Sequence, residues 1–160
     1  MTQPSPTDPS PDGDTRYEQY VSFLVGDRAY GVDIIRVREI KQWTAPTALP
    51  NQPAHIRGVL NLRGTIVPVH DLRARFGGPL TEAGEMNVIV IVTLQERTIG
   101  ILVDAVSDII TVALNDILAV PTTSAEADLK SLSGLVNTDA GMVALLNLDG
   151  LFPQTAPAAA

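Results

Sequence analysis

The chain has 160 residues, 45% of them hydrophobic, and it carries a formal net charge of −7 and no cysteine. The hydrophobic fraction is high enough for a folded core, whereas the acidic balance argues against a surface that follows nucleic-acid phosphates. The lack of cysteine excludes disulfides, thiolate catalysis and Cys-ligated metals. The N-terminal sequence does not resemble a signal peptide, and no apolar run approaches the ~20 residues of a membrane span. We therefore expect a cytoplasmic protein without direct membrane insertion.

Both ends of the chain are expected to lie outside the fold. Residues 1–16 contain four prolines among Ser, Thr and Asp, a composition that cannot offset the entropy of ordering by burial. We expect a disordered tail there and a second flexible tail at residues 154–160. The folded domain is predicted over residues 17–153, with two interleaved subdomains at about 17–86 and 87–153.

Short segments rich in Val and Ile, separated by Gly, Pro and Asn, are typical of β-strands and account for most of the chain. The expected strands are Tyr17–Val25, Arg28–Asp33, Ile56–Leu62, Thr65–Asp71, Val88–Leu94, Thr98–Asp104, Leu132–Asn137 and Met142–Leu148. VGDR and LQER are expected to be hairpin turns. One helix is predicted in DIIRVREIKQW, where Asp33 can cap the N-terminus and Ile34, Val37 and Ile40 fall near one face. DLRARFGG predicts a single helical turn that the glycines end.

An internal repeat is the most informative feature of the sequence. RAYGVDIIRVREI (residues 28–40) aligns with RTIGILVDAVSDI (residues 97–109) at an offset of 69, and Glu39 then corresponds to Asp108. Residues 58–76 align with residues 134–152 at an offset of 76. The repeat predicts a duplication. Half of the chain suffices for about five short strands, which close most readily into a small barrel because closure leaves no free edge.

Histidine and aspartate stand side by side in NLRGTIVPVHDLR (residues 61–73), which raises the question of catalysis. His70 and Asp71 are neighbours on an expected strand, so their side chains point to opposite faces and cannot pair as in a catalytic triad. His55 has no Cys or Glu at metal-ligand spacing, and no phosphate loop, HExxH or nucleophile elbow is found. The sequence predicts no catalytic, cofactor or metal site. A half-exposed strand residue is favoured for His70 over a cryptic hydrolase or phosphoryl site.

Arg63 lies in the expected LRG turn, where Gly64 is suited to the unusual backbone angles. Its counterpart in the second repeat is Asp139, so the duplicated fold does not require an arginine at this position. Two interpretations stay open: Arg63 is a solvated turn charge, or it is a recognition residue with Glu39 as its ionic partner.

Other residues of this region also have two interpretations. Pro68 lacks an N–H and therefore indicates an edge strand or a bulge. Trp43, the only tryptophan, is either a core residue or an interface anchor. Arg73 and Arg75 are consistent with ordinary surface charges on a helical turn that Asp71 caps.

Together these features resemble the CheW family, the coupling proteins of bacterial chemosensory arrays. The resemblance rests on YGVDIIRVREI, IRGVLNLRGTIVPVHDLR, RTIGILVDAVSDII and LLNLDGLF, and it extends from Tyr17 to Phe152. It implies an all-β fold of two SH3-like five-stranded β-barrel subdomains from an internal duplication, with one or two short helices. It also implies an adaptor without catalysis. The implied partners are the cytoplasmic tip of methyl-accepting chemoreceptors and the regulatory domain of the CheA histidine kinase, whose autophosphorylation comes under receptor control.

The resemblance also implies site residues. Receptor contact in the family uses the groove between the subdomains, near the short helix and the LRG corner, which by motif position nominates Ile34, Val37, Glu39, Gly58, Arg63 and Ile109. Arg63 and Glu39 are expected to pair and to hold the corner against the helix. The kinase is expected to dock at the barrel ends, at residues that the sequence does not identify. Recruitment to membrane-associated receptor arrays is expected to follow from these contacts.

The sequence departs from the family pattern at two places. It has ILAVP (residues 117–121) where a basic, proline-rich segment is usual, and His70 where an aliphatic residue is usual. Both departures affect the partner details rather than the fold. An alternative function is a CheW-like docking module of another chemosensory-type pathway, such as twitching motility or second-messenger control.

Overall fold

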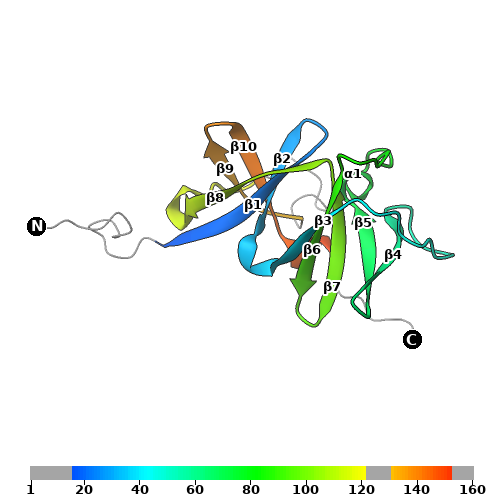
Figure 1. Ribbon diagram of the computed structural model, residues 1–160. Coiled ribbons are helices and arrows are strands. Elements are labelled where there is room, and N and C mark those ends of the chain that lie inside the picture. The colour runs from blue at the N-terminus through cyan, green and yellow to red at the C-terminus, as the bar shows by residue number, and fades with distance from the viewer. Residues whose placement is uncertain (1–15, 122–130, 153–160) are drawn as a thin grey trace, which may run out of the picture.

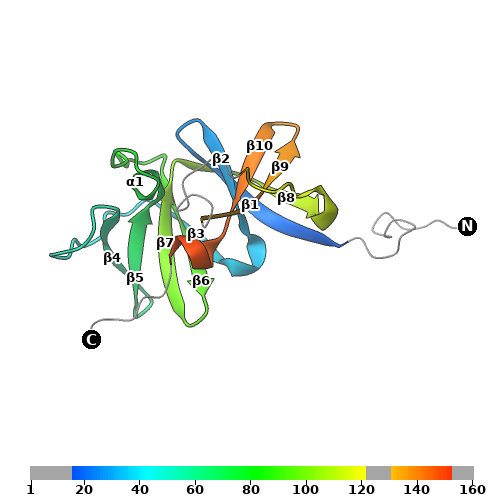
Figure 2. The same cartoon turned by 180° about the vertical axis from the view of Figure 1, so that it is seen from behind.

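The structure, a computed structural model, describes residues 16–121 and 131–152. Within them, two five-stranded sheets lie side by side (Figures 1 and 2). Sheet A has the strand order β8-β1-β2-β10-β9, and sheet B has the order β3-β6-β7-β5-β4. The all-β prediction is confirmed. The expected tails, apart from Arg16, lie outside the described residues.

The strands of sheet A are β1 (Tyr17–Val25), β2 (Arg28–Asp33), β8 (Ala105–Ala113), β9 (Leu132–Thr138) and β10 (Gly141–Leu146). The strands of sheet B are β3 (Val37–Gln42), β4 (Ile56–Leu62), β5 (Thr65–Asp71), β6 (Val88–Leu94) and β7 (Arg97–Val103). The other elements are the 3-10 turns η1 (Ile34–Arg36) and η2 (Leu114–Asp116) and the short helices α1 (Leu72–Arg75) and α3 (Leu148–Leu151). Strands β1, β2, β4, β5 and β6 have the bounds that the sequence predicts.

The helix expected over residues 33–43 is wrong. Asp33 does act as a cap and accepts a hydrogen bond from Ile35 N at 3.0 Å, but only η1 follows it. The next residues form β3, which is antiparallel to β6 and has a bulge between Val37 and Glu39. The bulge inserts one extra residue, so Val37 and Ile40 lie on the same face of β3 although they are three residues apart in the sequence. A spacing of three is also that of a helix face, which explains the wrong prediction. Strand β8 was missed.

The strand registers repeat with the offsets of the sequence repeat. The pair Leu24↔Ala29 in sheet A corresponds to Thr93↔Thr98 in sheet B, at the offset of 69. Yet the repeats, β1–β5 and β6–β10, do not each form one sheet. Sheet A combines β1 and β2 of the first repeat with β8, β9 and β10 of the second. The two sheets are therefore intertwined, and the predicted division near residue 86 separates the repeats rather than the sheets.

One isolated backbone bridge closes each sheet into a barrel. In sheet B, Thr47 follows β3 and pairs with Val59 of β4, with N···O distances of 2.9 and 2.8 Å. In sheet A, Leu118 follows β8 and pairs with Leu135 of β9, at 2.8 and 2.9 Å. Val59 and Leu135 correspond at the offset of 76. Both copies of the repeat thus close at the same position.

A glycine lies beneath each closing segment. A Cβ atom at Gly58 would lie 2.3 Å from the carbonyl oxygen of Thr47, and one at Gly134 would lie 2.4 Å from Ile117 Cγ2. Gly58 also has a φ of 141°, which side-chain-bearing residues rarely adopt. The repeat keeps these glycines because the chain crosses directly over them.

Three apolar clusters stabilise this arrangement: one inside each sheet and the largest between the sheets. Strand β6 contributes to two of them. Ile89 and Ile91 face the interior of sheet B, whereas Val90 and Val92 face the cluster between the sheets. Burial on both faces explains why β6 is continuously apolar in sequence.

Pro68 does not lie on an edge strand, because β5 lies between β4 and β7. The parallel ladder between β5 and β7 nevertheless covers only Val69–Asp71. In sheet A, the equivalent residue Ala144 does pair with Tyr30 of β2. Since proline cannot donate to a ladder, Pro68 accounts for the position at which the β5–β7 pairing begins.

The first prediction concerns Gly58. We expect Gly58→Ala to lower the free energy of unfolding by at least about 3 kcal/mol, because the new methyl group meets a backbone carbonyl and the backbone angle is strained. Gly84→Ala is the matched control, since a Cβ atom there would meet nothing within 4 Å. Urea unfolding of both variants measures the difference; equal stability would show that Thr47 moves away freely.

Candidate functional site

The turn between β4 and β5 presents Arg63. Arg63 and Gly64 form a two-residue turn with φ angles of 53° and 91°, both in the left-handed region. Two positive φ angles suit the twist of a tight hairpin. Gly64 N donates to Asn61 Oδ1 at 2.8 Å, which fixes the turn. Gly64 is suited to this turn as expected, but Arg63 also takes a conformation that is strained for a residue with a side chain.

Arg63 Nη2 lies 3.0 Å from Glu39 Oε1, so the expected ion pair is confirmed. Glu39 lies in strand β3, however, and not in a helix. Because β3 and β4 are the two edge strands of sheet B, the pair spans the seam at which the barrel closes. The Arg63 side chain stays 69% exposed and that of Glu39 30% exposed. An exposed pair contributes little stability, and both groups are accessible to a partner.

The other nominated residues lie at three further places. Ile34 and Val37 are partly buried where the chain passes from sheet A to sheet B, and Val37 packs against the core between the sheets. Ile109 lies on β8 of sheet A and is 51% exposed. Gly58 is buried beneath Thr47, which gives it a structural role in the closure. Sequence reasoning missed Ile35, which is 83% exposed in η1.

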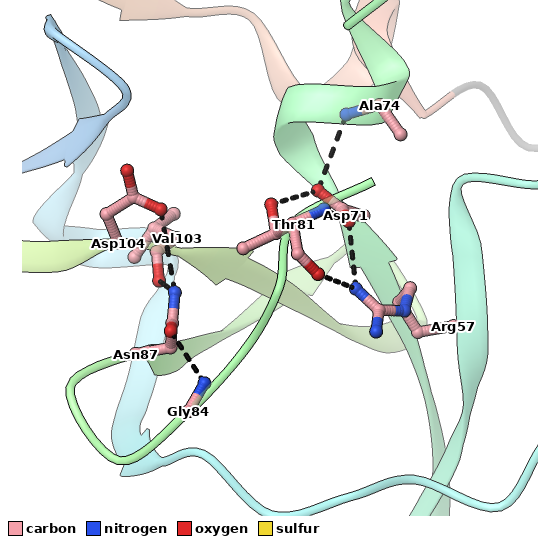
Figure 3. A network of polar contacts seen from close by, with 8 residues as sticks. All are labelled: Arg57, Asp71, Ala74, Thr81, Gly84, Asn87, Val103 and Asp104. Carbon is pink, nitrogen blue, oxygen red and sulfur yellow. Dashed lines mark hydrogen bonds and ion pairs between the residues drawn. The ribbon is translucent and has the colours of Figure 1, made fainter. Parts of the chain in front are cut away.

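The carboxylate of Asp71 is fully buried and holds three elements together (Figure 3). It accepts hydrogen bonds from Thr81 N at 2.7 Å and Thr81 Oγ1 at 2.8 Å. It also caps α1 through Ala74 N at 3.4 Å, as the sequence predicts. A buried carboxylate requires such partners. The hydrogen bonds of the Asp71 carboxylate therefore hold the fold together.

Arg57 completes this network, and sequence reasoning missed it. Its Nη1 atom lies 3.0 Å from Asp71 Oδ2 and donates to Thr81 O at 2.8 Å. Its guanidinium carbon lies 5.7 Å from the ring centroid of Trp43, within the range of a cation–π contact. Arg57 belongs to the motif IRGVLNLRG on which the family resemblance rests, but its spacing did not single it out.

The comparisons with known proteins agree with this arrangement. Residues 19–156 match the CheW-like domain family. The chain belongs to this family. It is 38% identical over 136 residues to Chemotaxis protein CheW of Rhizobium meliloti, covering 85% of this chain and 88% of the relative. A relative with another name, Protein FrzA of Myxococcus xanthus, is 29% identical over 141 residues, or 87% of both chains.

A solved structure of the family is also similar. The scaffolding protein TtCheW from Thermoanaerobacter tengcongensis superposes with a TM-score of 0.79 and is 32% identical. The match covers 88% of this chain and 90% of that chain. The expected family resemblance is therefore confirmed in both sequence and fold.

His70 of this CheW-like chain is not half-exposed as expected. It is buried, with 9% of its surface accessible, and its ring lies 5.5 Å from that of His55 and 4.6 Å from that of Phe152. Its Nδ1 atom has no hydrogen-bond partner among the described residues. Burial, together with the nearby cationic groups of His55, Arg97 and Arg75, lowers the pKa of His70 to about 4. The ring is neutral near pH 7 and packs as an apolar group.

The site of this CheW-like chain is a surface and not a cavity. A cavity of about 600 Å³ lies against β2 and β10, and none of the nominated residues lines it. Within residues 16–121 and 131–152, no group of three or more His, Asp or Glu side chains could hold a metal ion. The arrangement is suited to protein contacts through exposed charges and apolar side chains.

The second prediction concerns pH. Since the folded-state pKa of His70 is about 4 and the ordinary value is 6.5, the unfolded chain binds a proton at higher pH than the folded chain does. The stability that depends on a neutral His70 is complete above about pH 6.5 and falls by up to roughly 3 kcal/mol as the pH drops to about 4.

We expect His70→Leu to flatten this part of the stability–pH curve, because leucine fills the site without titrating. Urea unfolding at several pH values between 4 and 7 measures the slope. His55→Ala is a comparison and not a neutral control, because it removes one group whose own pKa is lowered by burial and one charge that lowers the pKa of His70; we expect it to reduce the slope by less than His70→Leu does. Identical slopes for wild type and His70→Leu would contradict the assignment.

Proposed function

We propose that this CheW-like chain is a non-catalytic scaffold that couples chemoreceptor cytoplasmic tips to the regulatory domain of the CheA histidine kinase. The scaffold places kinase autophosphorylation under receptor control in bacterial chemotaxis. The family match and the printed names of the relatives, chemotaxis proteins and a scaffolding protein, support this proposal.

The Arg63–Glu39 pair is the observation that carries the proposal. At the equivalent seam of sheet A the residues are Asp139 and Asp108, two acids that cannot form such a pair. The fold therefore closes a barrel without this ion pair. An exposed pair that the fold does not need is available for recognition.

The receptor surface consists of Glu39 and Arg63 together with the apolar residues Ile34, Val37 and Ile109, and Ile35 extends it. Gly58 supports the surface indirectly, because it allows Thr47 to cross over β4. The kinase-contacting residues are not part of this assignment.

The scaffold acts without catalysis and reaches the membrane through its partners. His70 and Asp71, the residues that first suggest chemistry, are both buried and point to different neighbours. In the part of the chain that the structure describes, no helix has the length and apolar character needed to cross a membrane. Recruitment to receptor arrays would then depend on protein contacts alone.

The second candidate function is a docking module of another chemosensory-type pathway, such as twitching motility or second-messenger control. The similarity to Protein FrzA, a family relative under another name, favours it. The two functions predict different cognate kinases. The coupling function is tested by reconstitution of the purified chain with receptor cytoplasmic fragments and CheA, and an unchanged autophosphorylation rate would refute it for those partners.

The third prediction concerns Arg63. We expect Arg63→Ala to weaken binding of the receptor fragment several-fold, because interfacial arginines are often dominant contacts. Its stability should change by no more than about 0.5 kcal/mol. Arg28→Ala is the matched control: Arg28 is an exposed arginine beside a hairpin turn with no ion pair or hydrogen bond from its side chain among the described residues.

Calorimetric titration and thermal unfolding of the two variants separate affinity from stability. If Arg63→Ala binds the receptor fragment with wild-type affinity, Arg63 is only a solvated turn charge and not a recognition residue. A double-mutant cycle with Glu39→Gln measures the contribution of the pair itself.

A further inference from the structure

The duplication provides an internal control for each polar contact. The cap of the short helix occurs in both copies: Ala74 N donates to Asp71 at 3.4 Å, and Gly150 N donates to Asn147 at the equivalent place at 3.3 Å. A contact that both copies keep belongs to the fold. A contact that only one copy has must be explained by something specific to that sheet.

The contacts of Arg57 exist in one copy only. The residues equivalent to Arg57 and Trp43 in sheet A are Ser133 and Val112, which cannot form an ion pair or a cation–π contact. Sheet A nevertheless closes through its own bridge at Leu118. Closure of a barrel therefore does not require the arginine or the tryptophan.

Arg57 and Trp43 lie on opposite sides of the seam of sheet B. Trp43 directly follows β3 and is held by a hydrogen bond from its backbone N to Asn87 O at 3.0 Å. Arg57 lies on β4, where Asp71 and the carbonyl of Thr81 fix its guanidinium group (Figure 3). The contact between them spans the same two strands as the contact between Glu39 and Arg63 does.

The Arg63 end of the β4–β5 hairpin has little lateral support besides this seam. The ladder to β7 begins only at Val69, because Pro68 has no N–H to donate. From Val59 to Val67 the hairpin is positioned by the bridge to Thr47, by its own buried leucines and by the contacts across the seam. A change in the contact between Trp43 and Arg57 would therefore move the turn that carries Arg63.

We propose that Arg57, stacked on Trp43, is a positioning residue that sets the width of the seam and so places Arg63 opposite Glu39 for partner binding. This inference rests on the proposed receptor surface. Arg57 itself does not contact the partner. Its side chain is 23% exposed, and its polar groups are directed at Asp71 and Thr81.

The test compares variants that change the stacking and retain the fold. Trp43→Leu removes the aromatic face but leaves Arg57 paired with Asp71, and Trp43→Phe restores an aromatic face. Arg57→Lys keeps the charge but loses the planar group that stacks and forks. Ser133→Ala is the matched control at the equivalent position of sheet A.

We expect Trp43→Leu and Arg57→Lys to weaken binding of the receptor cytoplasmic fragment by roughly fivefold, a size typical of residues that act through others. Trp43→Phe and Ser133→Ala should bind like the wild type. Amide hydrogen exchange of residues 60–67 should accelerate about tenfold in the two weakened variants, while β6 stays protected, because local opening is confined to the hairpin.

The fluorescence of Trp43 provides a separate readout, because it is the only tryptophan. In Arg57→Lys its emission should shift to longer wavelength as water reaches the ring, with no partner added.

If Arg57→Lys and Trp43→Leu keep wild-type affinity and exchange rates while Arg63→Ala loses affinity, the positioning role is wrong and the receptor surface stands. If Arg63→Ala also binds normally, the receptor surface itself is wrong. Faster exchange in Trp43→Leu without loss of affinity would likewise overturn the positioning role.

Discussion

The closure of each sheet by a segment that crosses over a glycine is the constraint on which the rest of the structure depends. Thr47 can pair with Val59 only because Gly58 has no side chain, and Leu118 pairs with Leu135 beside Gly134 in the same way. Without these bridges each five-stranded sheet would expose two edges. In sheet B, closure also brings β3 next to β4, and the seam formed in this way positions Glu39 and Arg63.

Intertwining of the repeats explains why the two sheets behave as one body. The chain passes from sheet A to sheet B at η1 and returns at Asp104, so neither repeat completes a sheet alone. Asp104 also joins the sheets through polar contacts, because its carboxylate accepts from Gly26 N at 2.6 Å and from Arg73 at 3.1 Å. The Asp104 contacts lie at the β1–β2 turn, whereas at η1, at the other end of β2, the two sheets are joined by the chain itself.

The sequence predicts strands well where two-residue alternation and tight turns coincide, as in β1, β2, β4, β5 and β6. It fails where a bulge shifts the alternation, as in β3. The exposure of His70 could not be predicted, because the packing of Phe152 against it brings together residues far apart in the chain. Arg57 was missed for the same reason, since Asp71 and Thr81 follow it by 14 and 24 residues. The Glu39–Arg63 pair was one of two open interpretations from the residues alone, and the family resemblance favoured it.

The energetics of Arg63 bear on its two interpretations. An arginine at a φ of 53° carries a strain of about 1 kcal/mol or more, where a glycine would carry none. The ion pair with Glu39 is mostly exposed and returns at most about 1 kcal/mol. Folding alone therefore gains nothing from arginine at this turn. The turn directs the charge away from the core across the seam, and a contact with a partner would supply the stabilisation that folding does not. The proposed role of the Arg57–Trp43 contact follows from this. A strained turn can present Arg63 to a partner only if the seam between β3 and β4 holds the turn in a fixed position.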